Sequence, residues 1–359
     1  MLPPDHLLNP FGVDPRLELP HPFSEAPQWS EYHYQFAYDP DHNVGVSIHI
    51  GRLLEDPGIW RGILYVFPPE GDVLIHRCIG RATPAGRGPA AGPFKSTCLE
   101  PMRLWRLEFD GAMHRATEAE LANGIARDGI DEVIKFDLLL EAAAPLYSLH
   151  KEAAKGTHTW PHHHHEQIHT LRGEFTYRGN LMQLRGMGIR DHSSGARDYT
   201  QMLGAHWIQL LFPSGRAAHA TVVSRQGSDM SKLYVANRKG GYIWWNDGAP
   251  LELVELLDGP PVCTNETPLA SLPRNILEDE RRNFSVTLGS SRGSQTIQIE
   301  RIRGTCTTYI PPCDEIAGTD LSRLDSLQQG KNILRASWDG EVGYGMTDHL
   351  ASIRFLRRV

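Results

Sequence analysis

The chain of 359 residues carries a formal net charge of -7, with 40% hydrophobic and 22% charged residues. This composition is typical of a globular protein, and the length suits two domains or one large all-β unit. The acidic balance and the lack of a basic run argue against a nucleic-acid partner. No apolar segment approaches the roughly 20 residues that a membrane-spanning helix needs, so no membrane partner is expected.

The sequence begins with neither the basic region nor the apolar run of a secretory signal. Its five cysteines are scattered and form no C-x-x-C pair. Such cysteines are typical of small core residues in a reducing compartment. We therefore expect a cytoplasmic protein.

In chain order, the pattern predicts mostly short antiparallel strands. Residues 1–28 are proline-rich and are expected to form an irregular lead-in. Aromatic residues then alternate at Tyr32, Tyr34, Phe36 and Tyr38, as in a strand with one aromatic face. Helical texture is limited to 117–128 and 321–329. The sequence thus predicts an all-β fold of antiparallel barrels or sandwiches with few short helices.

A segment from Pro145 to Thr159 has the composition of a linker. We therefore place the domain boundary within this segment, with an N-terminal domain over 29–155 and a C-terminal domain over 156–359.

The second domain opens on a histidine run, His162–His165, followed by Glu166. In an extended strand His162, His164 and Glu166 share one face, whereas His163, His165 and His169 share the other. Imidazole and carboxylate groups are good ligands for a divalent first-row ion. A metal site therefore stays open beside the simpler interpretation of a polar strand entry.

The densest group of ionisable residues lies between Gly186 and Tyr199. With a period of two, Asp191 continues the apolar row of Met187 and Ile189, whereas Arg190 and His192 lie on the opposite face. A carboxyl group at the end of an apolar row is partly desolvated, which raises its pKa and suits a proton donor. The alternative is a turn that salt bridges of Arg190, Asp191, Arg197 and Asp198 hold together.

Two later strands carry further candidates. His206 heads the apolar row Ile208, Leu210 and Phe212, so it either lines the same cavity as Asp191 or is a hydrogen-bonded core residue. Asp348 ends a glycine-rich strand that contains Tyr344. It either joins the site or caps a helical turn over 350–355.

These motifs resemble, in their order, the tandem lipocalin-like proteins related to carotenoid 1,2-hydratase (hydroxyneurosporene synthase). The resemblance covers roughly Trp29 to His349 and rests on Trp29 with Glu31, His164-His165, the block Gly186 to Asp198, His206-Trp207, and Gly340 with Gly343-Tyr344-Gly345. Ser194 and Tyr199 stand where the family usually has tryptophan, which indicates a smaller or more polar wall. The resemblance implies two packed lipocalin-like (calycin) β-barrels or sandwiches and an apolar cavity. We expect the site in the C-terminal domain.

Together these features favour a cofactor-independent lyase or isomerase, foremost a hydratase or dehydratase of a hydrophobic terpenoid, steroid-like or aromatic molecule. Asp191 would donate the proton, His192 or His206 would activate water, and Glu166 would orient one of them. Arg190 and Arg197 would hold the carboxylates. The expected substrate-binding residues are Arg190, Arg197, Asp198, Tyr199, Trp207, His164, Tyr34, Tyr344 and Asp348, with the aromatic rings stabilising a cationic intermediate.

Two alternatives remain: a non-catalytic binder of apolar ligands, and a metal-dependent enzyme that uses His162–His165. The sequence lacks the glycine-rich motifs of nucleotide-binding and phosphate-binding loops, so no cofactor is expected. A homodimer is left open.

Overall fold

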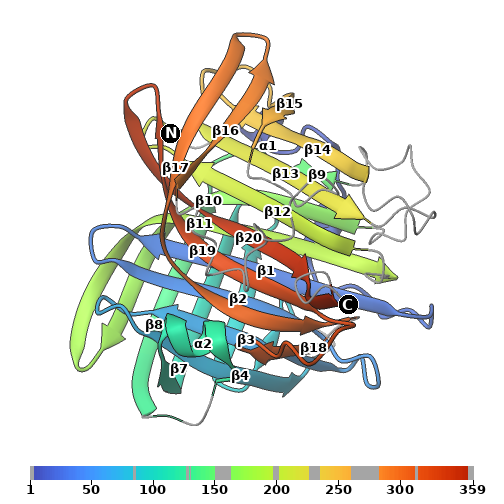
Figure 1. Ribbon diagram of the computed structural model, residues 1–359, viewed down its shortest axis with the longest axis vertical. Coiled ribbons are helices and arrows are strands. Elements are labelled where there is room, and N and C mark those ends of the chain that lie inside the picture. The colour runs from blue at the N-terminus through green and yellow to red at the C-terminus, as the bar shows by residue number, and fades with distance from the viewer. Residues whose placement is uncertain are drawn as a thin grey trace. The chain divides into compact units, whose positions relative to one another are not determined.

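The computed structural model describes residues 4–83, 86–126, 129, 131–149, 163–196, 202–225, 235–259, 283–311 and 314–354. Contacts divide the chain into two compact units, one of residues 1–117 and 127–198 and the other of residues 118–126 and 199–359. Each unit has its own antiparallel sheet, which confirms the all-β prediction (Figure 1). No helix in the described ranges is long and apolar enough to cross a membrane.

Among the described residues, the named elements of the first unit are the short helical segments α1 and η1 and the strands of one sheet. Their bounds are α1 (Asp5–Leu8), η1 (Pro15–Glu18), β1 (Trp29–Asp39), β2 (Val44–Arg52), β3 (Ile59–Phe67), β4 (Val73–Arg81), β5 (Ala90–Ala91), β6 (Phe94–Glu100), β7 (Leu104–Ala116), β8 (Asp131–Ala142), β9 (Tyr147–Ser148), β10 (His163–Tyr177) and β11 (Asn180–Ala196).

Among the described residues, the named elements of the second unit are the helix α2 and the strands of the other sheet. Their bounds are α2 (Glu118–Asn123), β12 (Met202–Leu211), β13 (Ala217–Arg225), β14 (Val235–Trp244), β15 (Glu252–Asp258), β16 (Asn283–Ser290), β17 (Gly293–Ile310), β18 (Asp314–Ala317), β19 (Leu327–Trp338) and β20 (Glu341–Ser352). The helix expected over 117–128 is confirmed in part by α2, whereas 321–329 ends in strand β19 and forms no helix.

Each sheet closes into a near-complete ring of eight strands. The first ring runs β4-β3-β2-β1-β11-β10-β8-β7 and closes because β4 pairs with β7. The second runs β16-β15-β14-β13-β12-β20-β19-β17 and closes because β16 pairs with β17. Closure leaves few open strand edges, which is how all-β proteins avoid edge-to-edge association.

The division between the units differs from the boundary expected at residue 155. Strands β10 and β11, which lie beyond that boundary, pair with β8 and β1 and complete the first ring. The strands β8 and β10, on either side of the segment with linker composition, pair with each other in the first unit, so that segment does not separate the two units. Which strands pair is decided by long-range register and not by local composition.

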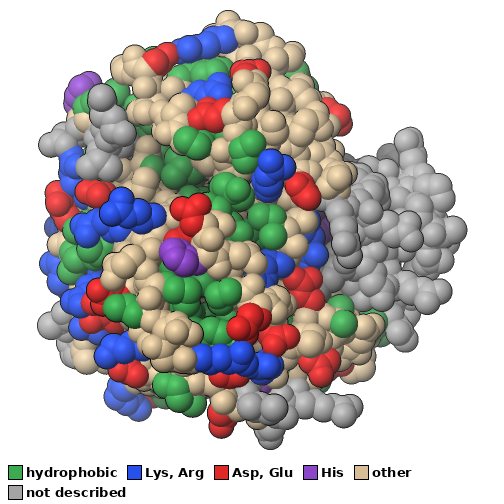
Figure 2. Space-filling model, turned by 90° about the vertical axis from the view of Figure 1, so that its left-hand side faces the viewer, with side chains coloured by type: hydrophobic (Ala, Val, Ile, Leu, Met, Phe, Trp, Pro, Cys, Tyr) green, Lys and Arg blue, Asp and Glu red, His purple; other side chains and the backbone are tan. Residues whose placement is uncertain are grey.

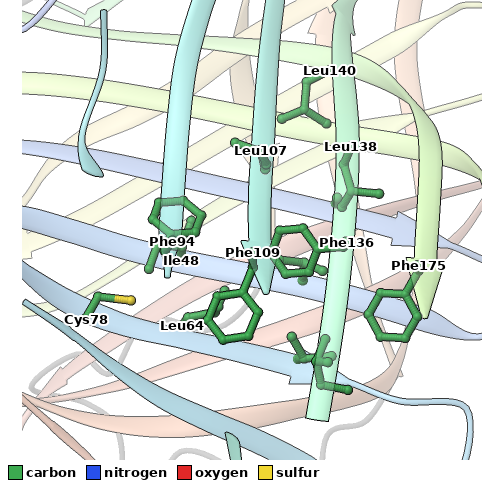
Figure 3. Close-up of a cluster of buried hydrophobic side chains, with 14 of the residues drawn as sticks. Ile48, Leu64, Cys78, Phe94, Leu107, Phe109, Phe136, Leu138, Leu140 and Phe175 are labelled. Carbon is green, nitrogen blue, oxygen red and sulfur yellow. The ribbon is translucent and has the colours of Figure 1, made fainter. Parts of the chain in front are cut away.

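Apolar side chains fill one part of the interior of the first ring. Phe94, Phe109, Phe136 and Phe175 gather there with leucines of β7 and β8 (Figure 3). All of these side chains are almost completely buried. Toward the start of β1 the inward positions change from apolar to polar, and the candidate site begins at that change.

Tight turns and close backbone contacts fix the register of the hairpins. Arg178 and Gly179 both have positive φ angles, 49° and 78°, as the two-residue turn between β10 and β11 requires. Gly345 lies where a Cβ atom would overlap the carbonyl oxygen of Gln209 on β12. The glycine-rich segment of β20 therefore permits a close approach of two backbones.

On the face shown in Figure 2, basic and acidic side chains are interspersed and apolar side chains form only small groups among the described residues. Charges of mixed sign at this spacing offset each other, so this face carries no field of one sign.

Candidate functional site

The candidate site is built on three neighbouring strands, β1, β11 and β10, whose side chains alternate between two faces. Ala37 and Leu171 belong to the apolar core of the first ring. Every second residue from them along the strand lies on the same side, and these residues define the inner face of the ring. The register pairs His33 with His192, and His192 with His165, on this inner face. It pairs Tyr34 with Asp191, and Asp191 with Glu166, on the opposite face.

His164, Glu166 and Asp191 form the cluster on the opposite face, which we call the outer cluster. The Nε2 atom of His164 lies 2.7 Å from Asp191 Oδ2 and 3.2 Å from Glu166 Oε1. His164 and Glu166 are buried, whereas 23% of the Asp191 side chain is exposed. Asp191 is therefore the member of this cluster that a small molecule can reach.

Charge sets the protonation of the outer cluster. Burial opposes protonation of His164, but the carboxylates of Asp191 and Glu166 outweigh it and raise its pKa to about 9. His164 is consequently an imidazolium at neutral pH and donates a charge-assisted hydrogen bond to Asp191.

Aromatic rings flank the outer cluster on the adjoining strands. Tyr34 stands opposite Asp191 on one side and opposite His49 of β2 on the other. The His49 ring stacks on Tyr32, with centroids 4.6 Å apart and an interplanar angle of 4°. The hydroxyl of Ser47 lies 3.2 Å from that of Tyr34. His49 is partly exposed, so it and Asp191 are both accessible.

The inner face carries a second group, the inner cluster, of Glu18, Glu31, Arg52, His165, Arg190 and His192. Glu31 Oε1 lies 2.9 Å from His192 Nε2, and Glu31 Oε2 accepts a hydrogen bond of 2.6 Å from Arg52. Glu18 comes from η1 in the lead-in, and its Oε1 lies 2.7 Å from Arg190 Nη2. Glu18, Glu31, Arg190 and His192 are 0% exposed.

Two carboxylates and two guanidinium groups offset each other in the inner cluster, so its histidines need not be charged. Burial lowers the pKa of His192 well below its usual value, and the neighbouring His165 adds to the effect. Burial likewise lowers the pKa of His169 to about 3. In contrast, the pKa of Glu18 falls below its usual range because Arg190 and His165 outweigh the effect of burial.

The remaining candidates lie in the second unit. His206 lies on the inner face of the second sheet, because it shares the side of β12 that carries the core residues Ile208 and Leu210. Its imidazole stacks on that of His349, with centroids 3.6 Å apart. Trp207 and Asp348 are paired on the opposite face. Tyr344 shares that face, and Asp348 accepts a hydrogen bond of 2.8 Å from Gln329.

The structure brings together some of the expected site residues and separates others. Asp191, Glu166, His164 and Tyr34 meet on one face of the first unit. His192 and Arg190 lie on the other face, because neighbours in a strand alternate, so His192 cannot share a site with Asp191. Glu166 orients His164 and not His192 or His206. Arg197, Asp198 and Tyr199 lie outside the described residues.

Two further expectations need correction or addition. Leu350 belongs to strand β20, so Asp348 does not cap a helical turn there. Sequence reasoning did not single out His49, which lies beside the outer cluster, although a histidine within the alternating run Val44 to Ile50 was a visible signal. It also missed Glu18, which no periodic pattern in the proline-rich lead-in identifies.

Among the described residues, two sets of side chains could hold a metal ion. The donor atoms of His164, Glu166 and Asp191 lie within 4.8 Å of one another, as do those of His21, Glu31 and His192. The histidine run does not form one set of ligands, because His163 and His165 share the inner face and His164 lies on the outer one. His162 lies outside the described residues.

The fold defines the class: an all-β protein of two eight-stranded antiparallel rings, the arrangement that the tandem lipocalin-like resemblance implied. The family model of a domain of unknown function, DUF7064, matches residues 14–258, and the chain belongs to this family. No curated protein matches the sequence.

Solved structures of low sequence identity are also similar. A crystal structure assigned as an AttH from Nitrosomonas europaea has a TM-score of 0.47 and 15% identity, covering 93% of this chain and 98% of that chain. Kievitone hydratase from Nectria haematococca has a TM-score of 0.48 and 12% identity, covering 90% and 89%. CghA has a TM-score of 0.48 and 9% identity, covering 91% and 89%. At these values the similarity carries no functional argument.

Proposed function

We propose that this protein is a cofactor-independent lyase or isomerase, foremost a hydratase or dehydratase, that acts on a hydrophobic small molecule at the outer cluster. The observation that carries the proposal is the hydrogen bond of 2.7 Å between buried His164 and the partly exposed Asp191. A donor and an acceptor of one proton are thus held in contact, and one of them is accessible.

The roles follow from accessibility. Asp191 would contact the substrate and exchange a proton with it, while the His164 imidazolium would hold the Asp191 carboxylate in place through the hydrogen bond from Nε2. Glu166, 1% exposed, would be a positioning residue that holds the imidazole and stabilises its positive charge. Tyr34 and His49 would pack against the apolar substrate beside Asp191.

The resting protonation state favours one direction of this chemistry. An imidazolium beside a carboxylate is a weak acid and a ready base. In a dehydration, Asp191 would take a proton from a carbon next to a carbonyl group and hold it, because His164 is already protonated. The adjacent C–O bond would break as the C=C bond forms, and the proton would return to the departing hydroxide to give water. Isomerisation uses the same proton and returns it to another carbon.

Deuterium exchange tests this proposal on any compound that carries the expected acidic C–H bond. Hydrophobic ketones, hydroxyketones and enones incubated with the protein in D2O should gain deuterium at the carbon next to the carbonyl, detectable by mass spectrometry. Asp191→Asn should lower the exchange rate by about 100-fold or more, because the amide cannot accept the proton.

Asp110→Asn is the matched control, since Asp110 is an exposed aspartate of the same ring that pairs with Lys135. It should exchange at the wild-type rate. Full exchange in Asp191→Asn, with the fold intact by circular dichroism, would refute the assignment of Asp191. Reversible binding of the same compounds without exchange in the wild type would instead support a carrier of apolar ligands.

A further inference from the structure

Four polar N–H groups from other parts of the first unit surround the Glu18 carboxylate. Arg190 Nη2 and His165 Nε2 lie 2.7 Å and 3.2 Å from Oε1. The backbone N–H of Met102 and the indole N–H of Trp105 donate to Oε2 at 3.2 Å and 3.4 Å. These donors come from β10, β11, β7 and the turn before β7, whereas the carboxylate comes from the lead-in.

The fit of Glu18 is incomplete. A guanidinium binds a carboxylate best through two parallel hydrogen bonds. Arg190, 0% exposed, approaches Glu18 only through Nη2, at 2.7 Å, and none of its three guanidinium nitrogens makes a well-aligned hydrogen bond among the described residues. Buried donors of this kind are costly to leave unpaired. The site therefore offers a carboxylate more donors than the tethered Glu18 uses.

Glu18 sits on a segment that is joined to the ring by a few further polar contacts. His21 Nδ1 lies 2.6 Å from Ser194 Oγ, and the His21 N–H donates to Glu31. Farther back, the carbonyl oxygen of Leu8 accepts a hydrogen bond from the Leu146 N–H. The segment is a short 3-10 turn with proline at its start, and it belongs to no sheet.

We propose that Met102, Trp105, His165 and Arg190 form a receptor for a carboxylate. Glu18 fills this receptor as a ligand tethered by the lead-in, and a free small-molecule carboxylate binds in its place when residues 14–21 withdraw. The receptor is separate from the outer cluster, since it lies on the opposite face of β10 and β11.

Removal of Glu18 tests the receptor with formate and acetate as probes. Glu18→Ala should lower the melting temperature, because Arg190 stays buried without its carboxylate partner. Sodium formate should then raise the melting temperature of the variant in a saturable way, by about 2–4 °C, as a ligand of the folded state does. Wild type and Glu174→Ala, which removes an exposed glutamate of β10, should show no such rise.

Three comparisons make this result specific. Sodium chloride of equal ionic strength and neutral acetamide should not reproduce the rise. The double variant Glu18→Ala/Arg190→Met has no buried charge left from the pair, so it should fold and should lose the response to formate. A response no larger than that to chloride, or an equal response in the double variant, would overturn the proposal.

Glu18→Gln keeps the test open if Glu18→Ala does not fold, because the amide preserves the shape of the side chain. Formate should displace this neutral group and accelerate hydrogen exchange of the amides in residues 14–21, measured by mass spectrometry. Unchanged exchange at high formate concentration would also overturn the proposal.

Discussion

The side chain of His164 is 7% exposed, yet its pKa is about 9 because two carboxylates outweigh the effect of burial. A group whose pKa is higher in the folded than in the unfolded protein binds its proton more tightly when folded. Its contribution to stability is therefore fully present below the unfolded value of 6.5 and is lost as the pH rises toward 9.

This linkage gives a measurable prediction for His164. Between pH 6 and pH 9.5, the wild type should lose about 2–4 kcal/mol more of its free energy of unfolding than His164→Asn does. Urea unfolding at both pH values measures the difference. Equal losses in the two proteins would mean that His164 is not held protonated by Asp191 and Glu166.

Sequence reasoning singled out Asp191 and Glu166 as candidates but did not predict that both contact His164. Alternation placed His164 with Glu166 and Asp191 with Ile189, each on the correct face of its own strand. His164 and Asp191 are 27 residues apart in the sequence, and they meet because the turn at Arg178 and Gly179 fixes the register between β10 and β11. The pairing of Glu31 with His192 spans 161 residues and leaves no local signal.

At the scale of elements, β11 depends on glycines that allow β1 and β8 to approach. A Cβ atom at Gly186 would overlap the carbonyl oxygen of Tyr38, and one at Gly188 would meet Leu140. Because a backbone carbonyl cannot rotate away as a side chain can, Gly186 is the less tolerant of the two positions.

Gly186→Ala should therefore destabilise the protein by about 1–3 kcal/mol, as other overpacking substitutions do. Chemical denaturation measures this effect. Gly124→Ala is the control, since the nearest atom to its added Cβ would be 3.9 Å away, and it should change stability by less than about 1 kcal/mol. Equal stability of Gly186→Ala and wild type would show that β1 and β11 are not packed as described.

The strands and most turns were predictable because alternation and turn residues are local properties. Ring closure was not, since it depends on which strands pair. The expected boundary at residue 155 followed a change in composition, but β10 and β11 return to β8 and β1.

For the whole molecule, this pairing predicts how the chain can be divided. A fragment of residues 1–155 leaves the edges of β1 and β8 open, whereas residues 1–198 contain the whole first ring. Open edges promote association, so the shorter fragment should be aggregated and the longer one monomeric with a cooperative thermal transition. Size-exclusion chromatography and calorimetry distinguish them. A cooperative, monomeric 1–155 fragment would contradict the assignment of β10 and β11 to the first ring.

Strands β10 and β11 carry the outer cluster on one face and the carboxylate receptor on the other. Neighbouring residues of these strands are therefore under different selection, one for stability and the next for catalysis. In a saturation mutagenesis library scored separately for cellular abundance and for turnover, substitutions at His165 and Arg190 would reduce abundance. Substitutions at Asp191 would reduce turnover with less effect on abundance, whereas those at buried His164 would reduce both. Along these strands, positions sensitive in the abundance assay would thus alternate with positions sensitive in the turnover assay. Deletion of one residue would shift the strand by one position and move each set of side chains to the other face.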